Sequence, residues 1–474
     1  MKRTLSRAGR ILRRLPRPLA VGALALAVAH ASAPPGLAEG KRNAGLPLIR
    51  DAEIEGLARD YAVPIFRAAG LSSSAVHIYL VNNRAFNAFV AGGQRMFLNI
   101  GTLSEAETPN QVIGVIAHET GHIAGGHLTR LRERVDKAQT MAIVGMLLGM
   151  GAVAGGAMSG SSNTTQMGQA VMMGTNNVLE HSLLAYQRSE ELAADRAGLK
   201  FLDATGQSGR GMLETFRRLA DQSMFMAKAA DPYYRSHPMP QDRIGALEEL
   251  VRKSPHFERR DPAELQLRHD LARAKVAGFL DPPATVLRRY PLSDQSLAAR
   301  YARAISASEH GDPGAALRQV DELIRAKPNY AFFHEFKGDI LLKLGRPREA
   351  IAPYRKAASL APGAALVRVG LGHALVSTED KTVLDEAIRE LKRSIAAEPE
   401  VGLAYRALAR AYALKGEEGQ AMVAAAQGYL SDGDWKSARE QALRAQARLP
   451  RGTPAWLQAD DIMKARPPKK DGRD

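Results

Sequence analysis

The sequence predicts a mostly helical protein, with an α+β domain that contains a small sheet followed by an α-solenoid of helical repeats. Three observations support this fold class. Two short runs between residues 76 and 100 alternate like strands, helical periodicity dominates after them, and the C-terminal third repeats itself. At 474 residues the chain is long enough for two or three domains. We place the first domain at residues 39–265, a linker at 266–292, the repeats at 293–460 and a disordered tail at 461–474.

Residues 1–38 have the three-part pattern of a secretory signal peptide. A basic region precedes the apolar run PLAVGALALAVA at residues 18–29, which is too short to span a bilayer comfortably. Small residues allow cleavage after Ala31, Ala33 or Ala38. An Arg-rich start also suits a mitochondrial presequence, but the apolar run is continuous rather than amphipathic, so we favour export to a periplasm.

Charge and cysteine content exclude several classes of function. Seven of the 65 basic residues precede the first acidic one, Glu39, and without them the net charge falls from +15 to +8. No basic run is interleaved with aromatic residues, so we expect no nucleic-acid partner. The sequence has no cysteine, which excludes disulfides and thiolate ligands, so any metal must be held by histidine and carboxylate side chains.

The first elements after the signal segment predict a helix packed near a small sheet. Residues 51–70 have helical spacing of apolar residues, at Ile54, Leu57, Tyr61 and Ile65. The run VHIYLV at 76–81 is typical of a strand, and RMFLNI at 95–100 is expected to be its partner. The intervening NAFVAGG predicts a turn or an exposed edge.

Residues 138–179 carry no charged side chain, and the apolar part at 141–160 is rich in glycine and methionine. Its length would permit a membrane span, but the glycines lower helical stability. We therefore favour a buried or membrane-surface hairpin. A lid and a peripheral membrane contact through 141–160 are the functional alternatives, since Met-rich apolar surface is adaptable.

The C-terminal third has the period of tetratricopeptide repeats. Pro328 and Pro362 lie 34 residues apart, and the next equivalent proline, Pro399, follows an insertion of three residues in STEDKT. Aligning these prolines places small residues in columns where paired helices touch, namely Ala316, Ala350, Ala387 and Ala421, and Gly338 and Gly372. Four repeats run from about 296 to 434, and Trp435 begins a degenerate cap.

The stretch IAHETGH contains the candidate catalytic residues. A helix is predicted to begin here with Thr108 as its N-cap and Gln111 completing a capping box. On that helix His118 and His122 lie about 40° apart around the axis, so both can bind one ion, and Glu119 can reach a water beside it. Zinc with three protein ligands keeps a fourth position for such a water.

The apolar residues before the motif, VIGVI at 112–116, predict that the helix is buried. Two histidines and a glutamate on a buried helix cost several kcal/mol unless they are paired or bind a metal. This cost favours a metal site over a chance occurrence of the motif.

The third ligand must come from another part of the chain. The segment YQRSEELAADRAG at 186–198 places Glu191 and Asp195 on one helical face, so that Glu191 can ligate the metal and Asp195 can orient a ligand histidine. From the residues alone this is one acidic pair among many, and a solvated helix face is the favoured interpretation. Glu190 and His181 stay open as alternatives. His127 is expected to point away from the two ligands, as a structural or surface histidine.

Several segments together resemble the HtpX/CAAX-prenyl-protease family of zinc metallopeptidases. They are HETGH with the following His127, the pattern E-x-x-x-D-R-x-G from Glu191 to Gly198, SHPMPQDRI at 236–244, and NAFVAGGQRMFLNIGTL before the motif helix. With its signal sequence and C-terminal repeats, the chain is similar to the soluble periplasmic BepA-type branch of this family.

The resemblance implies one zinc ion per subunit, bound by His118, His122 and Glu191, with Glu119 as general base and Asp195 supporting a ligand histidine. It also implies catalytic roles for two residues of the third motif, His237 and Arg243. In that case His237 would stabilise the oxyanion of the reaction or instead occupy the open position of the metal.

The expected function is that of a zinc endopeptidase that degrades misfolded or stalled exported proteins. An edge strand near 95–100 would bind extended substrates by main-chain hydrogen bonds, and the repeats would hold clients. The resemblance implies outer-membrane β-barrel proteins and their assembly machinery as clients and partners, together with chaperone activity. The alternative is mainly a chaperone or scaffold whose zinc site is usually closed.

Overall fold

The computed structural model describes residues 40–41, 46–134, 186–225, 237 and 241–467, with the exception of 73, 93 and 132. The expected signal segment and residues 141–160 lie outside this part of the chain, and the expectations for them stay predictions. Within the described residues, no helix combines the length and the apolar character needed to cross a membrane.

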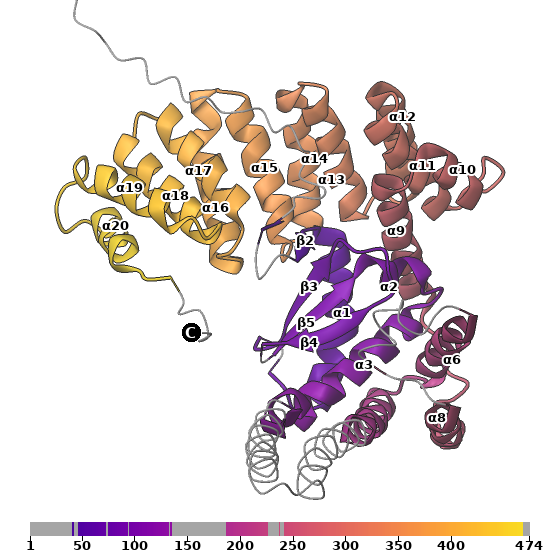
Figure 1. The fold of residues 1–474 in the computed structure, drawn as a ribbon. Coiled ribbons are helices and arrows are strands. Elements are labelled where there is room, and N and C mark those ends of the chain that lie inside the picture. Colours follow the sequence, from indigo (N-terminus) through magenta and orange to yellow (C-terminus); the bar gives the residue numbers. More distant parts are fainter. Residues whose placement is uncertain are drawn as a thin grey trace, which may run out of the picture. The chain divides into compact units, whose positions relative to one another are not determined.

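A five-stranded sheet with the order β1-β2-β3-β5-β4 forms the β part of the N-terminal region (Figure 1). Its strands are β1 (Gly40–Lys41), β2 (Pro47–Ile49), β3 (His77–Val81), β4 (Ala88–Ala91) and β5 (Arg95–Asn99). β3 and β5 pair in parallel, with His77 opposite Arg95 and Val81 opposite Asn99, whereas the other pairs are antiparallel. The two runs predicted as partner strands are therefore neighbours.

The outermost strand at one end of this sheet is β4, which corrects the expectation of an edge strand near 95–100. β4 and β5 form an antiparallel hairpin whose turn includes Gly92 in the left-handed conformation, with φ of 56°. β5 consequently has a partner on each side. The segment NAFVAGG, predicted to be a turn or an exposed edge, contains both the edge strand β4 and the turn.

The core of the N-terminal region lies between one face of the sheet and three helices, α1 (Ala52–Ala68), α2 (Ile100–Glu105) and α3 (Pro109–Gly125). α1 begins where predicted, because the Asp51 side chain accepts a hydrogen bond of 2.9 Å from the Ile54 amide. The residues buried at this core include Leu57, Met96, Leu98, Val112 and Ile116. Each such side chain contributes roughly 1.5–3 kcal/mol by its removal from water, which fixes α3 against the sheet.

Three more helical segments complete the N-terminal region. Residues 186–204 are helical, and α6 (Arg210–Phe225) and α8 (Gln241–Lys253) follow. Met212 and Phe216 of α6 are fully buried in the same core as α3. α6 thus packs against α3, and α8 packs against α6.

The segment 266–292, which we interpreted as a linker, is largely helical. It consists of α9 (Ala263–Leu280) and α10 (Pro283–Arg289). α9 packs against two cores, through Val276 on one side and Leu271 and Ala274 on the other. Because it is buried on more than one face, it lacks the single apolar stripe that identifies a helix in a sequence.

Successive antiparallel helices make up the repeat region (Figure 1). They are α11 (Leu297–His310), α12 (Pro313–Ala326), α13 (Ala331–Lys343), α14 (Pro347–Leu360), α15 (Ala365–Ser377), α16 (Leu384–Ala397), α17 (Gly402–Leu414), α18 (Glu418–Ser431), α19 (Trp435–Gln446) and α20 (Pro454–Lys464), with the short 3-10 helix η1 (Lys381–Val383) in the inserted residues. This architecture confirms the predicted fold class.

The small residues predicted to lie at helix contacts do so. Ala316, Ala350 and Ala387 are fully buried, and a side chain at Gly338 would collide with the Tyr354 ring, because a Cβ atom there would lie 2.6 Å from it. The C-terminal boundary differs from the expected one. α20 continues to Lys464, four residues into the segment predicted as a tail, and residues 468–474 lie outside the described part.

A buried polar cluster joins α1 to helices of the following part of the chain. The Lys275 Nζ atom lies 2.8 Å from Asp51 and 3.2 Å from Glu53, and Tyr301 and Tyr330 donate hydrogen bonds of 3.0 and 2.5 Å to Glu53. Burial raises the pKa of the Glu53 carboxyl. Burial in this cluster therefore disfavours the charged form of Glu53.

A fully buried carboxyl beside this cluster, Asp339, accepts a hydrogen bond from the Tyr354 hydroxyl. Burial raises the pKa of Asp339 from 3.8 to about 7. A raised native-state pKa means that its contribution to stability is complete below the unfolded-state pKa and is lost as the pH rises through about 7.

Asp339→Asn should therefore raise the melting temperature at pH 8, because the amide keeps an acceptor for Tyr354 without a buried charge. The gain should shrink toward pH 5, where Asp339 is protonated in the native state. Each 1 kcal/mol corresponds to roughly 2–4 °C in a unit of 150–250 residues. Thermal unfolding followed by circular dichroism measures this, with the exposed Asp432→Asn as control; a pH-independent difference would contradict it.

Candidate metal centre

The helix α3 carries His118, Glu119 and His122 and is buried along most of its length. It begins at Thr108, whose hydroxyl accepts a hydrogen bond of 3.4 Å from the Gln111 amide. The Gln111 side chain accepts from the Glu107 amide, at 2.7 Å, rather than from Thr108. The predicted capping box is thus shifted by one residue, but the predicted helix start is confirmed.

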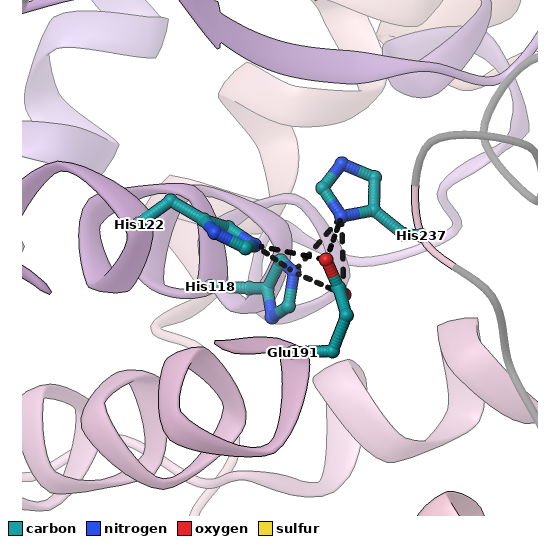
Figure 2. Close-up of side chains that lie close together, drawn as sticks. All are labelled: His118, His122, Glu191 and His237. Carbon is teal, nitrogen blue, oxygen red and sulfur yellow. Dashed lines mark hydrogen bonds and ion pairs between the residues drawn. The ribbon is translucent and has the colours of Figure 1, made fainter. Parts of the chain in front are cut away.

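Four buried side chains, His118, His122, Glu191 and His237, converge on one point (Figure 2). Each offers one ligand atom, and these atoms all lie within 4.8 Å of one another. The Nε2 atoms of His118 and His122 are 3.1 Å apart, and each lies 3.4 Å from a Glu191 oxygen. The Nδ1 atom of His237 lies 3.1 Å from Glu191 and 3.4 Å from His118 Nε2.

A close helix crossing brings Glu191 to the two histidines of α3. At Gly121 a Cβ atom would lie 2.7 Å from the carbonyl oxygen of Ala194, and at Gly198 one would lie 3.1 Å from the backbone of Ala117. Only glycine permits backbones to approach this closely. Glu191 and Asp195 are therefore placed one helical turn apart opposite the histidines.

Asp195 and Arg243 support the group from behind. Asp195 Oδ1 lies 2.9 Å from His118 Nδ1, the ring nitrogen that faces away from the other three ligand atoms. Arg243 makes a bidentate pair with Asp195, at 2.6 and 2.7 Å, and also lies 2.7 Å from Glu191. One guanidinium on α8 thus fixes both Glu191 and Asp195.

The electrostatics of the group favour a bound cation. Burial acts to raise the pKa values of Glu191 and Asp195, but their neighbours together outweigh it, and both values are lowered. The largest opposing contributions come from His237 for Glu191 and from Arg243 for Asp195. Burial likewise opposes the charge on His118, but the facing carboxylates raise the pKa of this histidine to about 9. Burial lowers the pKa of His122 to about 3. Charged carboxylates thus face one proton that a metal ion can replace.

Glu119 lies beside the four ligand atoms without being one of them. It is fully buried, and neither carboxylate oxygen has a hydrogen-bond partner among the described residues. Its Oε1 atom lies 3.4 Å from His237 Nε2. Burial raises the pKa of this carboxyl, so Glu119 binds a proton more readily than an exposed glutamate does.

The donor chemistry fits a divalent metal. Three imidazole nitrogens and one carboxylate form a common donor set for zinc and related ions, in a group that offers at least three protein ligands. Burial of Glu119 without a hydrogen-bond partner would cost several kcal/mol in the absence of a nearby positive charge.

His127 does not point away from the ligands, which corrects the expectation for this residue. Its Nδ1 atom lies 2.9 Å from Nδ1 of His122, and its Nε2 atom lies 2.9 Å from Glu190. The expectation assumed one continuous helix, but α3 ends at Gly125 and Gly126 adopts the left-handed conformation, with φ of 65°. The adjacent glycines in GGH were the sequence signal for this break.

The two alternative ligands differ in outcome. Glu190 pairs with His127 and Arg130 and is not part of the group of four, whereas His181 lies outside the described residues. Of the residues singled out in the sequence, His118, His122, Glu191 and His237 are brought together, with Glu119, Asp195 and Arg243 next to them.

A buried group of histidines and a carboxylate in a helical domain with a small sheet defines a candidate metallopeptidase domain, joined here to tetratricopeptide repeats. Comparison with protein families supports both parts. Residues 49–251 match peptidase family M48, and residues 301–365 match a tetratricopeptide repeat model. The chain thus contains a domain that matches peptidase family M48, which confirms the resemblance inferred from the sequence.

Curated proteins similar to this chain are named as β-barrel assembly-enhancing proteases. The β-barrel assembly-enhancing protease of Escherichia coli K12 is 24% identical over 323 residues, which cover 66% of this chain and 63% of that protein. The Yersinia pestis protein of that name is 24% identical over 75% of this chain and 71% of its own length. The putative Vibrio cholerae protein is 32% identical over 42% of this chain and 38% of its own length. Family and relatives indicate a metalloprotease.

This chain therefore matches slightly less than two thirds of the Escherichia coli relative. The solved structure MamA MSR-1 C2 has a TM-score of 0.30 at 20% identity, with 36% of this chain and 98% of that chain covered. A score this low adds nothing to the assignment.

The helix crossing at Gly121 can be tested by adding one methyl group. Gly121→Ala should destabilise the protein by about 1–3 kcal/mol, because the new Cβ atom overpacks against the Ala194 carbonyl. The matched change Gly56→Ala on α1, where nothing lies within 4 Å of the new atom, should instead stabilise it by about 0.5–1 kcal/mol. Urea unfolding of both variants measures the difference; equal stabilisation would show that the crossing tolerates a side chain.

Proposed function

We propose that this protein is a zinc-dependent endopeptidase of the periplasm that degrades misfolded or stalled exported polypeptides. We also propose that it has chaperone activity in outer-membrane protein assembly. The observation that carries the proposal is the buried group of His118, His122 and Glu191 with Glu119 beside it. The names of the relatives, which are β-barrel assembly-enhancing proteases, support the assignment to outer-membrane assembly.

Zinc is the proposed metal because the donor set combines neutral imidazoles with one carboxylate, and the chain has no cysteine. His118, His122 and Glu191 would hold one ion per subunit. When bound, zinc supplies a Lewis acid that polarises the scissile carbonyl and lowers the pKa of a water molecule.

The side chains of this chain then divide the remaining work. Glu119 accepts the proton of the attacking water and passes it to the leaving amine, as its position beside the ligand atoms and its raised pKa favour. His237 is placed to donate a hydrogen bond to the developing oxyanion when it is turned away from the metal. Arg243 holds Glu191 and Asp195 in place, and we propose this role for it in catalysis.

The edge strand β4 is the proposed binding surface for extended substrates. As the outermost strand of the sheet, it offers main-chain groups on one side for pairing with another chain. Phe89 of β4 stacks on Phe97 of β5 with ring centroids 5.0 Å apart, and Phe97 in turn stacks on Tyr79 at 5.2 Å. A chain paired with β4 would extend this aromatic face, which favours unfolded segments with apolar side chains.

The repeats supply a second surface for polypeptides. Tetratricopeptide helices stack into a solenoid whose surface binds extended or partly folded chains. We propose that misfolded clients, outer-membrane β-barrel proteins and components of their assembly machinery bind there. No nucleic-acid partner is proposed.

A second candidate function is that of a chaperone whose zinc site is usually closed. The position of His237 favours it, because its Nδ1 atom lies within the group of four ligand atoms and would fill the position that a substrate carbonyl needs. Proteolysis would then require displacement of His237.

Glu119→Gln separates catalysis from metal and client binding. The change removes the proton acceptor but keeps the shape of the side chain, so cleavage of casein should fall by about 10²–10⁴-fold. Bound zinc, measured by atomic absorption, should stay at one ion per chain. The same substitution at the exposed Glu258 should leave cleavage unchanged; surviving cleavage in Glu119→Gln would show that the proposed mechanism is wrong.

His237→Ala distinguishes the two roles of that histidine. If His237 closes the site, its removal should raise basal casein cleavage several-fold while zinc stays bound by the other three ligands. Initial rates at equal zinc occupancy measure this. A fall in cleavage would instead support oxyanion stabilisation.

A further inference from the structure

The second ring nitrogen of His122 has a hydrogen-bonding partner of its own. His122 presents Nε2 to the group of ligand atoms, and its Nδ1 atom lies 2.9 Å from Nδ1 of His127. Both rings are buried, and they meet edge to face with centroids 4.9 Å apart. Water is therefore largely excluded from this contact, and the two nitrogens must satisfy each other.

This contact fixes the tautomers of both rings. A neutral imidazole has one donor and one acceptor nitrogen. If Nε2 of His122 is to bind a metal, its proton must lie on Nδ1, so that His122 donates and His127 accepts. The proton of His127 must then lie on Nε2, which is 2.9 Å from the Glu190 carboxylate, an acceptor.

Glu190 is held in turn by cationic and aromatic side chains. Arg130 lies 2.5 Å from the same Glu190 oxygen and 3.2 Å from the Tyr186 hydroxyl. The guanidinium of Arg134 lies over the Tyr186 ring, 3.9 Å from its centroid. These contacts connect the residues that follow α3 to the helix 186–204. The series of side-chain contacts from His122 through His127 to Glu190 therefore ends on groups that have partners of their own.

The two ligand histidines of α3 are thus oriented differently. Asp195 faces His118 Nδ1 directly at 2.9 Å and is held by Arg243. His122 reaches its carboxylate, Glu190, only through His127. The left-handed Gly126 makes this possible, because it ends α3 and turns His127 back toward the ring of His122.

We propose that His127 is a positioning residue of the metal site: it accepts the Nδ1 proton of His122 and so directs Nε2 of that ring to the metal, while Glu190 and Arg130 fix its own tautomer. The proposal rests on the proposed zinc site and adds a residue to it. Removal of such an outer partner lowers metal affinity by roughly 10–100-fold in comparable sites.

Zinc affinity, measured on the full-length chain by competition with a chromophoric chelator, tests this role without reference to proteolysis. His127→Ala should weaken zinc binding about 10–100-fold. His127→Asn should retain most of the affinity, because the Asn oxygen lies near the position of Nδ1 and can accept the proton of His122. His127→Gln places its amide near the position of Nε2 instead, and should bind zinc as weakly as the alanine variant.

Controls separate positioning from general stability. The exposed His310→Ala should bind zinc like the wild type. Metal-free thermal unfolding of all variants reports any loss of fold, so the comparison is made between variants with equal metal-free stability. If His127→Ala is destabilised, the decisive comparison is between His127→Asn and His127→Gln, because both keep a polar side chain at the site.

The outcomes distinguish this proposal from the proposed function. Wild-type zinc affinity in His127→Ala would overturn the positioning role. Zinc affinity restored by His127→Gln but not by His127→Asn would overturn it too, because it would show that the contact with Glu190 matters and the contact with His122 does not. If the wild-type chain bound no zinc, the proposed function would fail as well. Zinc binding by the wild type with unchanged affinity in every His127 variant would refute the positioning role alone.

Discussion

The close contact between α3 and the helix 186–204 is the constraint on which the rest of the site depends. Gly121 and Gly198 let the two backbones approach until the carboxylates of one helix reach the histidines of the other. A larger side chain at either glycine would separate them, and Glu191 lies only 3.4 Å from its histidine neighbours. Backbone packing between the two helices therefore sets the geometry of the candidate metal site.

Charge compensation makes this packing possible. The contact buries three carboxylates, Glu119, Glu191 and Asp195, which is costly unless positive groups face them. Arg243 faces Glu191 and Asp195, and His237 faces Glu119. A divalent ion between the histidines would complete the compensation and would couple metal binding to the stability of this helix pair.

Sequence reasoning found the parts of this arrangement that have a local signature. The helical spacing of His118 and His122 and the Thr108 cap follow from patterns within one element. The column of Ala316, Ala350 and Ala387 follows from the repeat period. Other features depend on how elements meet. The edge position of β4 follows from the hairpin at Gly92, and α9 is buried on more than one face, so neither has a readable period.

His127 shows the same limit at a single residue. A helical projection places it opposite the ligands only if α3 continues, and the two glycines before it end the helix. His237 and Arg243, which were carried over by resemblance, do lie at the site. They come from a segment with no spacing relation to α3. Their position near the site needed knowledge of a family, because no local pattern connects residues more than a hundred positions apart.

Comparison of the two buried charge clusters shows why one of them is the candidate metal site. At Lys275 the carboxyls of Glu53 and Asp339 accept hydrogen bonds from tyrosine hydroxyls, and burial raises their pKa values. Burial there disfavours the charged form of both carboxyls. At α3, imidazoles and a guanidinium hold Glu191 and Asp195 in the charged form. Carboxylates held in the charged form beside imidazole nitrogens favour a cation, whereas burial beside phenols disfavours the charged form of a carboxyl, and the difference lies in the neighbours rather than in the number of acidic residues.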